Sequence, residues 1–130
     1  MAITVSRPKV KFEDDRGGII CIVDVDDIAF RSVLRITSKA GTIRSNHYHK
    51  NDSHYLYIES GKCEYSEKPA DDPKASVETV SLIPGDLVLT KPGIIHAVKF
   101  LEDTVLYAFT TEKRQHEKYE EDTVRVTIIE

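Results

Sequence analysis

Histidines are the residues of this chain whose spacing points most directly to chemistry. Three of the five, His47, His49 and His54, lie within eight residues, and a fourth, His96, follows the turn signal Lys91-Pro92-Gly93. Alternate residues of a strand point to the same face, so His47 and His49 can bind one ion if their strand borders a pocket. Imidazole is a common ligand of zinc and other transition metals. This spacing predicts a metal centre.

His54 and His96 are expected to point into the same interior. His54 is in phase with the apolar Leu56, and His96 with the apolar Val98. A single inward histidine is more often a hydrogen-bonded core residue than a ligand, but four together without a ligand would leave several buried ring nitrogens unsatisfied. We therefore predict one set of four metal ligands, made up of His47, His49, His54 and His96. The fifth histidine, His116, lies in a charged segment and is expected at the surface.

This set of donors restricts the metal. Four neutral imidazoles leave the full charge of a divalent ion uncompensated and favour borderline transition metals over Mg²⁺ or Ca²⁺. We expect one divalent transition metal ion, with Zn, Fe, Ni, Cu and Mn as candidates. One or two coordination positions would stay open for a substrate oxygen or water. Such an ion would act as a Lewis acid, and iron or copper would also bind O₂.

The elements that must position these histidines are strands, because nearly all of the hydrophobic pattern has a period of two. Short β-branched and aromatic runs alternate with turn signals, which predicts an all-β sandwich or barrel. The best helix candidate is the polar segment Thr111–Asp122, and Glu67–Lys74, with its two prolines, is predicted to be a loop. The expected strands are Lys9–Phe12, Ile19–Val25, Ser32–Thr37, His54–Ile58, Ser76–Ile83, Asp86–Thr90, His96–Leu101, Thr104–Thr111 and Thr123–Ile129.

Two motifs carry a family resemblance. The segment Gly41-x5-His47-x-His49-x4-His54-x6-Gly61 resembles the first cupin motif, and Gly85-x5-Lys91-Pro92-Gly93-x2-His96 resembles the second. The first motif usually has a glutamate where this chain has His54. On these residues the chain is identified as a member of the cupin superfamily, with an RmlC-like barrel of the four-histidine metal-binding type. The resemblance implies an all-β, single-domain cupin jelly-roll β-barrel (a double-stranded β-helix).

A second resemblance concerns the substrate. The segment from Arg44 through His47, Tyr48 and His49 to Lys50 is similar to segments of deoxysugar epimerases and nucleotide-sugar ketoisomerases in the same superfamily. In the epimerases, a histidine at the place of His47 serves as base and the arginine binds the nucleotide phosphates, generally without a metal. A metal-bound imidazole has no free lone pair for a proton. We favour the metal because His54 and His96 complete a ligand set.

Three residues are candidates for substrate binding. Arg44 lies an odd step from His47, so parity places it on the outer face unless a bulge intervenes. The residues two positions before and after Arg35 and Tyr107, which share their strand face, allow either a barrel-lining or an outward position. We predict that both side chains line the pocket. A guanidinium there would suit a carboxylate or phosphate. Asp52 lies in a polar turn, and a solvated role is expected for it.

Three functions fit this pattern. The first is a metal-dependent enzyme that isomerises or epimerises a small oxygenated, sugar-like substrate. The second is a metal-dependent dioxygenase of a small organic substrate, which the same ligands would serve if the ion is redox-active. The third is a non-catalytic module that binds or senses a small-molecule ligand. The residues leave open which of the three applies and whether the protein is an enzyme.

The composition is that of a globular protein. The chain has 130 residues and a formal net charge of −4, which fits one domain over residues 1–130. This charge gives no support to nucleic-acid binding, and no apolar stretch is long enough to span a membrane. The N-terminal residues lack the layout of a signal peptide, so we expect a cytoplasmic protein. Cys21 and Cys63 are expected to be separate, reduced thiols.

The first and last strands predict the oligomeric state. Ile3–Val5 and Thr123–Ile129 each have an edge that would be protected by pairing with another subunit. Members of the cupin superfamily are often dimers through such edges. We therefore predict a homodimer.

Overall fold

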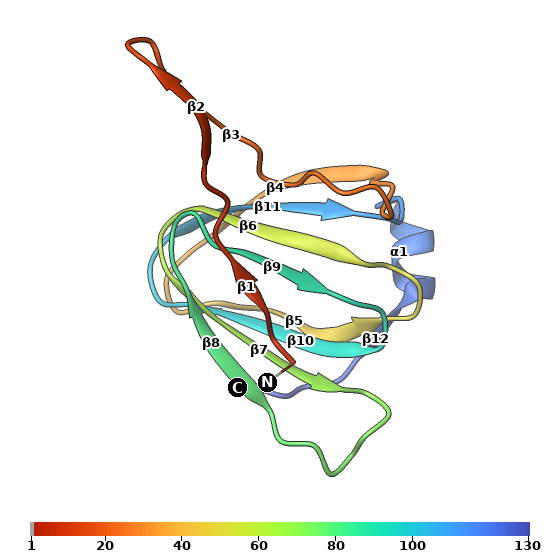
Figure 1. The fold of residues 1–130 in the computed structure, drawn as a ribbon. Coiled ribbons are helices and arrows are strands. Elements are labelled where there is room, and N and C mark those ends of the chain that lie inside the picture. Colours follow the sequence, from red (N-terminus) through yellow and green to blue (C-terminus); the bar gives the residue numbers. More distant parts are fainter. Residues whose placement is uncertain (1) are drawn as a thin grey trace.

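A computed structural model describes residues 2–130. Two antiparallel five-stranded sheets enclose the interior of a barrel, and a short helix, α1 (His116–Asp122), lies at one end (Figure 1). The first sheet contains, in spatial order, β1 (Val5–Ser6), β9 (Leu87–Thr90), β6 (His54–Ser60), β11 (Thr104–Thr110) and β4 (Ser32–Ser38). The second contains β12 (Thr123–Arg125), β5 (Ile43–His49), β10 (Ile94–Phe100), β7 (Cys63–Pro69) and β8 (Glu78–Leu82). The predicted all-β barrel is confirmed.

The alternation of apolar and polar residues decides which side chains enter the barrel. On β6, His54, Leu56 and Ile58 are buried, while Tyr55 and Tyr57 are only half-buried. The apolar core is continuous across both sheets, with a fully buried set that includes Ile58, Tyr65, Leu82, Val88 and Phe100. This core fixes the strand register, because a slip of one residue would turn every inward side chain outward. The histidines are held by that register.

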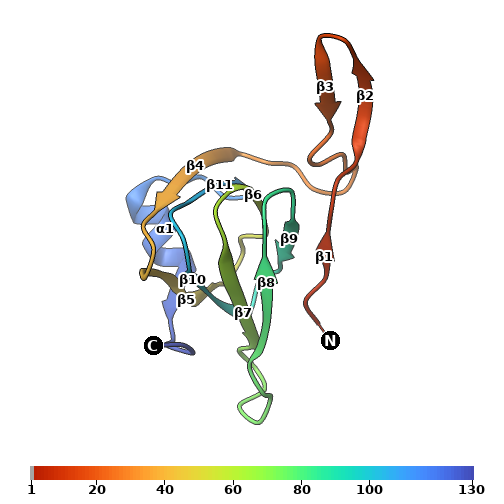
Figure 2. The ribbon, with the colours of Figure 1, turned by 90° about the vertical axis from the view of Figure 1, so that its left-hand side faces the viewer.

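A hairpin made of β2 (Val10–Asp14) and β3 (Gly17–Ile20) projects away from the barrel (Figures 1 and 2). Its exposed side chains include Phe12, at 51% exposure, and Ile19, at 59%. Val10 and Ile20 are exposed as well. An isolated two-stranded hairpin is marginally stable in water. The hairpin therefore presents an apolar surface outside the core.

Several predicted boundaries differ from those observed. The predicted loop Glu67–Lys74 begins too early, because β7 continues to Pro69, where a proline is tolerated at a strand end. Within the helix candidate Thr111–Asp122, only His116–Asp122 is helical. The predicted final strand Thr123–Ile129 is reduced to β12, because the residues after it form hydrogen bonds to Asn46 instead of a regular ladder. No helix within residues 2–130 has the length and hydropathy needed to cross a membrane.

Candidate metal centre

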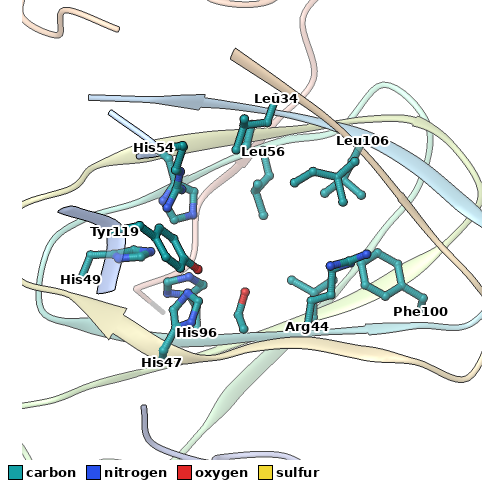
Figure 3. Close-up of a pocket in the computed structure, with 15 residues that line it drawn as sticks. Leu34, Arg44, His47, His49, His54, Leu56, His96, Phe100, Leu106 and Tyr119 are labelled. Atoms are coloured by element: carbon teal, nitrogen blue, oxygen red, sulfur yellow. The ribbon is translucent and has the colours of Figure 1, made fainter. Parts of the chain in front are cut away.

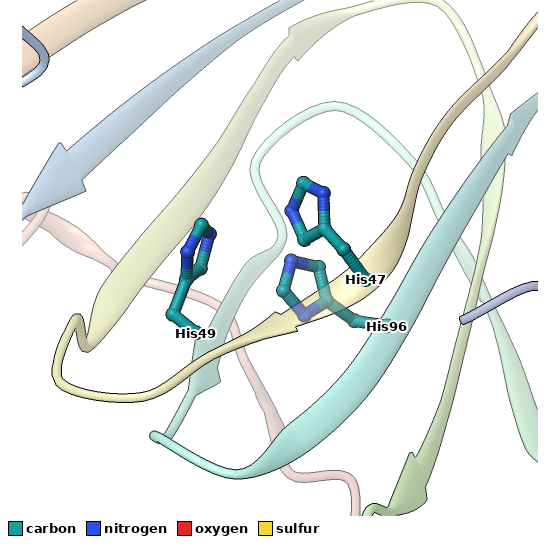
Figure 4. A group of neighbouring side chains, drawn as sticks. All are labelled: His47, His49 and His96. Atoms are coloured by element: carbon teal, nitrogen blue, oxygen red, sulfur yellow. The ribbon is translucent and has the colours of Figure 1, made fainter. Parts of the chain in front are cut away.

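Four histidines from three strands meet inside the barrel. His47 and His49 come from β5, His54 from β6 and His96 from β10, and all four are buried. Figure 3 shows their four rings gathered at one end of the interior, and Figure 4 shows His47, His49 and His96 alone. His96 lies directly opposite His47 in the pairing of β10 with β5, while His54 enters from the other sheet. The predicted convergence of the four imidazoles is present.

The separations between the rings fit ligands of a single ion. Five of the ring pairs have centroid distances between 4.6 and 5.7 Å. Rings that bind one ion through Nε2, with metal–nitrogen bonds of about 2.1 Å, have centres roughly 4.5–5.3 Å apart. Ligand atoms of His47, His49 and His96 lie within 4.8 Å of one another. A second such group consists of His49, His54 and Asp52, so His49 is common to both.

In three of the four histidines, Nδ1 lies within hydrogen-bonding distance of an oxygen atom outside the cavity. Nδ1 of His54 lies 2.9 Å from Oδ2 of Asp52, and Nδ1 of His96 lies 3.0 Å from the carbonyl oxygen of Ile94. Nδ1 of His49 lies 3.3 Å from the Thr123 hydroxyl oxygen, whose own proton is donated to the Tyr119 carbonyl oxygen. When Nδ1 donates its proton to such an acceptor, Nε2 keeps a free lone pair, which is the usual outer-shell arrangement around a metal-ligating histidine. The lone pairs are therefore directed toward the cavity.

His47 differs from the other three, because its Nδ1 is buried and has no hydrogen-bond partner within residues 2–130. A buried ring nitrogen without a partner is costly and calls for a ligand or a water molecule. The Nδ1 of His47, unpaired within the described part of the chain, and a donor set made up of nitrogen atoms are both compatible with a bound transition metal ion.

The protonation of the histidines also fits metal binding. Burial, followed by the charges of His54, Arg125 and Arg114, lowers the pKa of His47 to about 4. Burial and the neighbouring histidines lower the pKa of His49 to about 3. Burial likewise lowers the pKa of His96 well below its usual range. These rings are neutral near pH 7, and the neutral imidazole is the form that binds a metal.

The solvated role predicted for Asp52 is wrong. Asp52 is 2% exposed, and its Oδ1 accepts hydrogen bonds from the backbone N–H groups of Thr111 and Glu112, both at 3.1 Å. Burial alone would raise the pKa of this carboxyl group, but the hydrogen bond and charge of His54 and the charge of Arg114 bring it below its usual value. The carboxylate is thus held ionised behind His54. The polar turn around it folds inward because these backbone donors require an acceptor.

A bulge in β5 brings Arg44 and His47 to the same face. Ala97 pairs with Ser45 and His96 with His47, so Asn46 is an extra residue in the strand. Ser45 and Asn46 have positive φ angles of 75° and 56°, which are uncommon for residues other than glycine. The predicted exception to parity therefore applies, and the Arg44 side chain lines the cavity (Figure 3).

The cavity next to the histidines has a volume of about 350 Å³. Its wall is largely apolar beyond the four imidazoles and includes Leu34, Leu56, Phe100 and Leu106 (Figure 3). Arg44 and Arg114 also line it, whereas within residues 2–130 no aspartate or glutamate does. The guanidinium of Arg44 is held by the Ser38 hydroxyl and the Thr37 carbonyl oxygen. This lining suits a small ligand with a negatively charged group.

The predicted cavity positions of Arg35 and Tyr107 are wrong. The two residues face each other across β4 and β11 on the outer side of the sheet. Arg35 is exposed, and the Tyr107 hydroxyl donates a hydrogen bond of 3.1 Å to Oε1 of Glu59. Their neighbours Leu34 and Leu106 enter the cavity instead. The alternation of side chains shows which residues of a strand share a face. In β4 and β11 it did not show which of the two faces lines the cavity.

Two cavity residues were missed by the sequence analysis. Arg114 precedes α1 and Tyr119 lies on it, and both line the cavity. The Arg114 guanidinium carbon lies 4.7 Å from the centroid of the Tyr119 ring. Their segment is polar and carries no apolar stripe, so the sequence gives no periodic signal for an inward side. The only hint is one aromatic residue in a run of charged ones.

Comparisons with known proteins bear on the fold. No family model and no curated protein matches the sequence. Among solved structures, a 3,4-ketoisomerase from Helicobacter canadensis has a TM-score of 0.78 at 16% identity, over 96% of this chain and 91% of that one. A dTDP-4-dehydrorhamnose 3,5-epimerase from Sulfolobus tokodaii has a TM-score of 0.79 at 19% identity, over 98% and 78%.

A third structure is the sugar 3,4-ketoisomerase QdtA from Thermoanaerobacterium thermosaccharolyticum in complex with TDP. It has a TM-score of 0.74 at 20% identity, over 95% of this chain and 87% of that one. At such identities the likeness concerns the fold. This chain therefore has the cupin-type jelly-roll fold of the RmlC-like sugar epimerases and ketoisomerases.

Proposed function

We propose that this protein is a metal-dependent isomerase or epimerase that acts on a small oxygenated, sugar-like substrate. The observation that carries the proposal is the orientation of the histidines. Three have Nδ1 held by an acceptor outside the cavity, at 2.9 Å for His54, 3.0 Å for His96 and 3.3 Å for His49. A cluster that served packing alone would not need its lone pairs directed to a common point.

The roles of the residues follow from this arrangement. His47, His49, His54 and His96 would hold the ion. When bound, it supplies Lewis-acid polarisation of a substrate carbonyl. Arg44 binds a negatively charged part of the substrate, and the apolar wall excludes water from the reacting carbons. Asp52 and the Ile94 carbonyl oxygen keep protons on Nδ1 of their histidines, which fixes the rings in place.

The fold supports a sugar-like substrate. Two of the similar structures are ketoisomerases and one is an epimerase, and QdtA was solved with TDP bound. Isomerisation and epimerisation of keto sugars share one chemical need, the removal and return of a proton next to a carbonyl group. A small, largely apolar cavity lined by two guanidinium groups, those of Arg44 and Arg114, suits that reaction.

The proposal is tested first by elemental analysis of the purified chain beside two variants. About one equivalent of a transition metal per chain is expected, lost in His96→Ala and retained in His116→Ala, whose histidine is exposed. Absence of metal from a protein that also fails to take up Zn²⁺ would overturn the metal dependence.

Catalysis is tested by solvent exchange. The metal-loaded protein is incubated in D₂O with TDP-4-keto-6-deoxyglucose, the sugar nucleotide present in one structure of the QdtA H51N mutant. NMR should show deuterium entering the carbon next to the carbonyl group faster than with His96→Ala. Equal exchange rates for the two proteins would argue against an isomerase or epimerase of this substrate class.

One observation favours a second candidate, a metal-free epimerase. The pair formed by His54 and Asp52, with 2.9 Å between Nδ1 and Oδ2, has the geometry of a base and its orienting carboxylate. In that case Asp52→Asn would abolish deuterium exchange, and addition of a chelator would leave the wild-type rate unchanged. Loss of exchange on chelation favours the metal-dependent candidate.

We also propose that the protein is a homodimer. The support is the apolar surface of the β2–β3 hairpin, where Phe12 and Ile19 are more than half exposed. A second copy of the chain would cover it, and β1 and β12, both at sheet edges, offer further pairing sites. Light scattering should give the mass of a dimer for the wild type and of a monomer for the double variant Phe12→Asp/Ile19→Asp. A monomeric wild type would disprove the dimer.

A further inference from the structure

Tyr119 is the one aromatic side chain beside the histidines that does not come from a strand. Its ring centroid lies 5.6 Å from that of His49 and 6.3 Å from that of His47. Figure 3 shows its hydroxyl group directed toward the imidazoles. We propose that the Tyr119 oxygen is a fifth ligand of the ion held by the four histidines. This inference rests on the proposed metal centre.

The ring separations are compatible with direct ligation. A phenol oxygen about 2 Å from an ion, shared with imidazoles at about 2.1 Å, places the phenol ring roughly 5.3–6.2 Å from each imidazole centre. The two measured values lie in or beside this range. The interplanar angles of 60° with His49 and 80° with His47 show that the phenol ring does not lie face to face with either imidazole.

The contacts of α1 hold Tyr119 in place from both sides. The Arg114 guanidinium lies 4.7 Å from its ring and 3.6 Å from Asp52, the carboxylate behind His54. The Thr123 hydroxyl donates to the Tyr119 carbonyl oxygen and lies 3.3 Å from Nδ1 of His49. Each end of the Tyr119 segment is thus tied to a residue that orients a histidine. Such support is typical of a ligand and unnecessary for a surface tyrosine.

Two other tyrosines use their hydroxyl groups in hydrogen bonds within the protein. The hydroxyl groups of Tyr65 and Tyr107 donate to carboxylates, those of Glu67 and Glu59. Within residues 2–130, the Tyr119 hydroxyl group has no such partner. On ligation its proton would leave to solvent, and the phenolate would supply the negative charge that four imidazoles lack. One coordination position would then remain for the substrate.

The inference is tested by spectroscopy on the full-length protein loaded with Fe³⁺ or Cu²⁺ alone. Ligation by a tyrosinate gives a visible charge-transfer absorption and resonance-enhanced ring vibrations, which imidazoles do not give. We expect both signals in the wild type and in Tyr107→Phe, the matched control on the outer face. Tyr119→Phe should lose both signals while it keeps about one equivalent of metal.

The outcomes separate this inference from the proposed function. One equivalent of metal in the wild type without a tyrosinate signal, or a signal that persists in Tyr119→Phe, overturns the ligation and leaves the histidine centre standing. Failure of the wild type to bind either ion overturns both. Unchanged circular dichroism of Tyr119→Phe excludes misfolding as the reason for a lost signal.

Discussion

Two clusters of buried polar side chains lie next to each other in the barrel, and they differ in where their hydrogen-bonding groups are directed. Glu67 pairs with His96 across β7 and β10, and Thr90 pairs with His54 across β9 and β6. Tyr65 links Glu67 and Thr90, at oxygen–oxygen distances of 2.8 and 2.6 Å. This glutamate cluster, made of Tyr65, Glu67 and Thr90, satisfies its groups internally.

The histidine cluster has the opposite arrangement. The Nδ1 atoms of His54, His96 and His49 are held from outside by Asp52, Ile94 and Thr123, and the other nitrogens of these rings face a cavity. A cluster whose groups satisfy one another contributes to stability. A cluster whose lone pairs have no partner within the protein is able to bind a ligand. The difference is why the histidine cluster is our candidate site, and the following experiments test that difference.

Acid should destabilise the metal-free protein through the histidine cluster. The pKa of His47 is lowered from 6.5 to about 4 and that of His49 to about 3. Below pH 6.5 the unfolded chain binds protons that the folded chain does not, so the free energy of unfolding falls as the pH decreases toward 4. At about 1.4 kcal/mol per pKa unit, the loss is on the order of several kcal/mol.

Urea unfolding in the presence of a chelator, repeated across this pH range, measures the loss. The variant His47→Gln should show a shallower dependence, and His116→Gln the same dependence as the wild type. A flat profile would mean that the histidines are not buried as neutral rings.

Removal of the charge behind His54 should weaken metal binding without abolishing it. Asp52→Asn is expected to lower metal affinity about 10–100-fold, because the carboxylate orients the ring and increases its basicity. Competition with a fluorescent chelator gives the affinity. Asp71→Asn, at an exposed loop position, is the control and should bind as tightly as the wild type. An unchanged affinity in Asp52→Asn would separate this carboxylate from the metal centre.

The glutamate cluster should respond in stability alone. Tyr65→Phe removes the donor to Glu67, whose pKa is already raised by burial. A buried carboxyl group that loses its partner costs about 1–3 kcal/mol of unfolding free energy. Metal content should stay unchanged. If Tyr65→Phe lost its metal and kept its stability, the contrast between the two clusters would be wrong.

The smallest effect is expected on the outer face. Tyr107→Phe deletes an exposed hydrogen bond to Glu59 and should change the free energy of unfolding by less than about 0.5 kcal/mol. Metal content and ligand binding should match those of the wild type. A weaker affinity for TDP-4-keto-6-deoxyglucose, measured by calorimetry, would restore Tyr107 as a binding residue.

The sequence predicts the fold and the histidine cluster because both depend on local spacing. Strands have a period of two, and the motif glycines and histidines keep fixed distances, so the convergence of His47, His49, His54 and His96 followed from the pattern. Their role as metal ligands stays a prediction. The dimer and the native metal are likewise untested.

The remaining site residues depend on tertiary features that spacing does not encode. Arg44 faces the cavity only because Asn46 adds a residue to β5. Arg35 and Tyr107 have the parity of a face, but which face is inner depends on the packing of the second sheet. Tyr119 reaches the histidines only through the position of α1. The positions of these four side chains could not be predicted from local periodicity.

The bulge at Asn46 also bears on when the site forms during biosynthesis. The Asn46 side chain accepts hydrogen bonds from the backbone of Ile128 and Ile129 and donates one to the Ile129 carbonyl oxygen. Its bond to Ile128 joins residues 82 positions apart. Since synthesis adds about 5–20 residues per second, the nascent chain holds its histidines for several seconds before this clamp exists. The bulge that brings Arg44 and His47 to one face is therefore stabilised only after residues 128 and 129 have been made and have folded back onto β5.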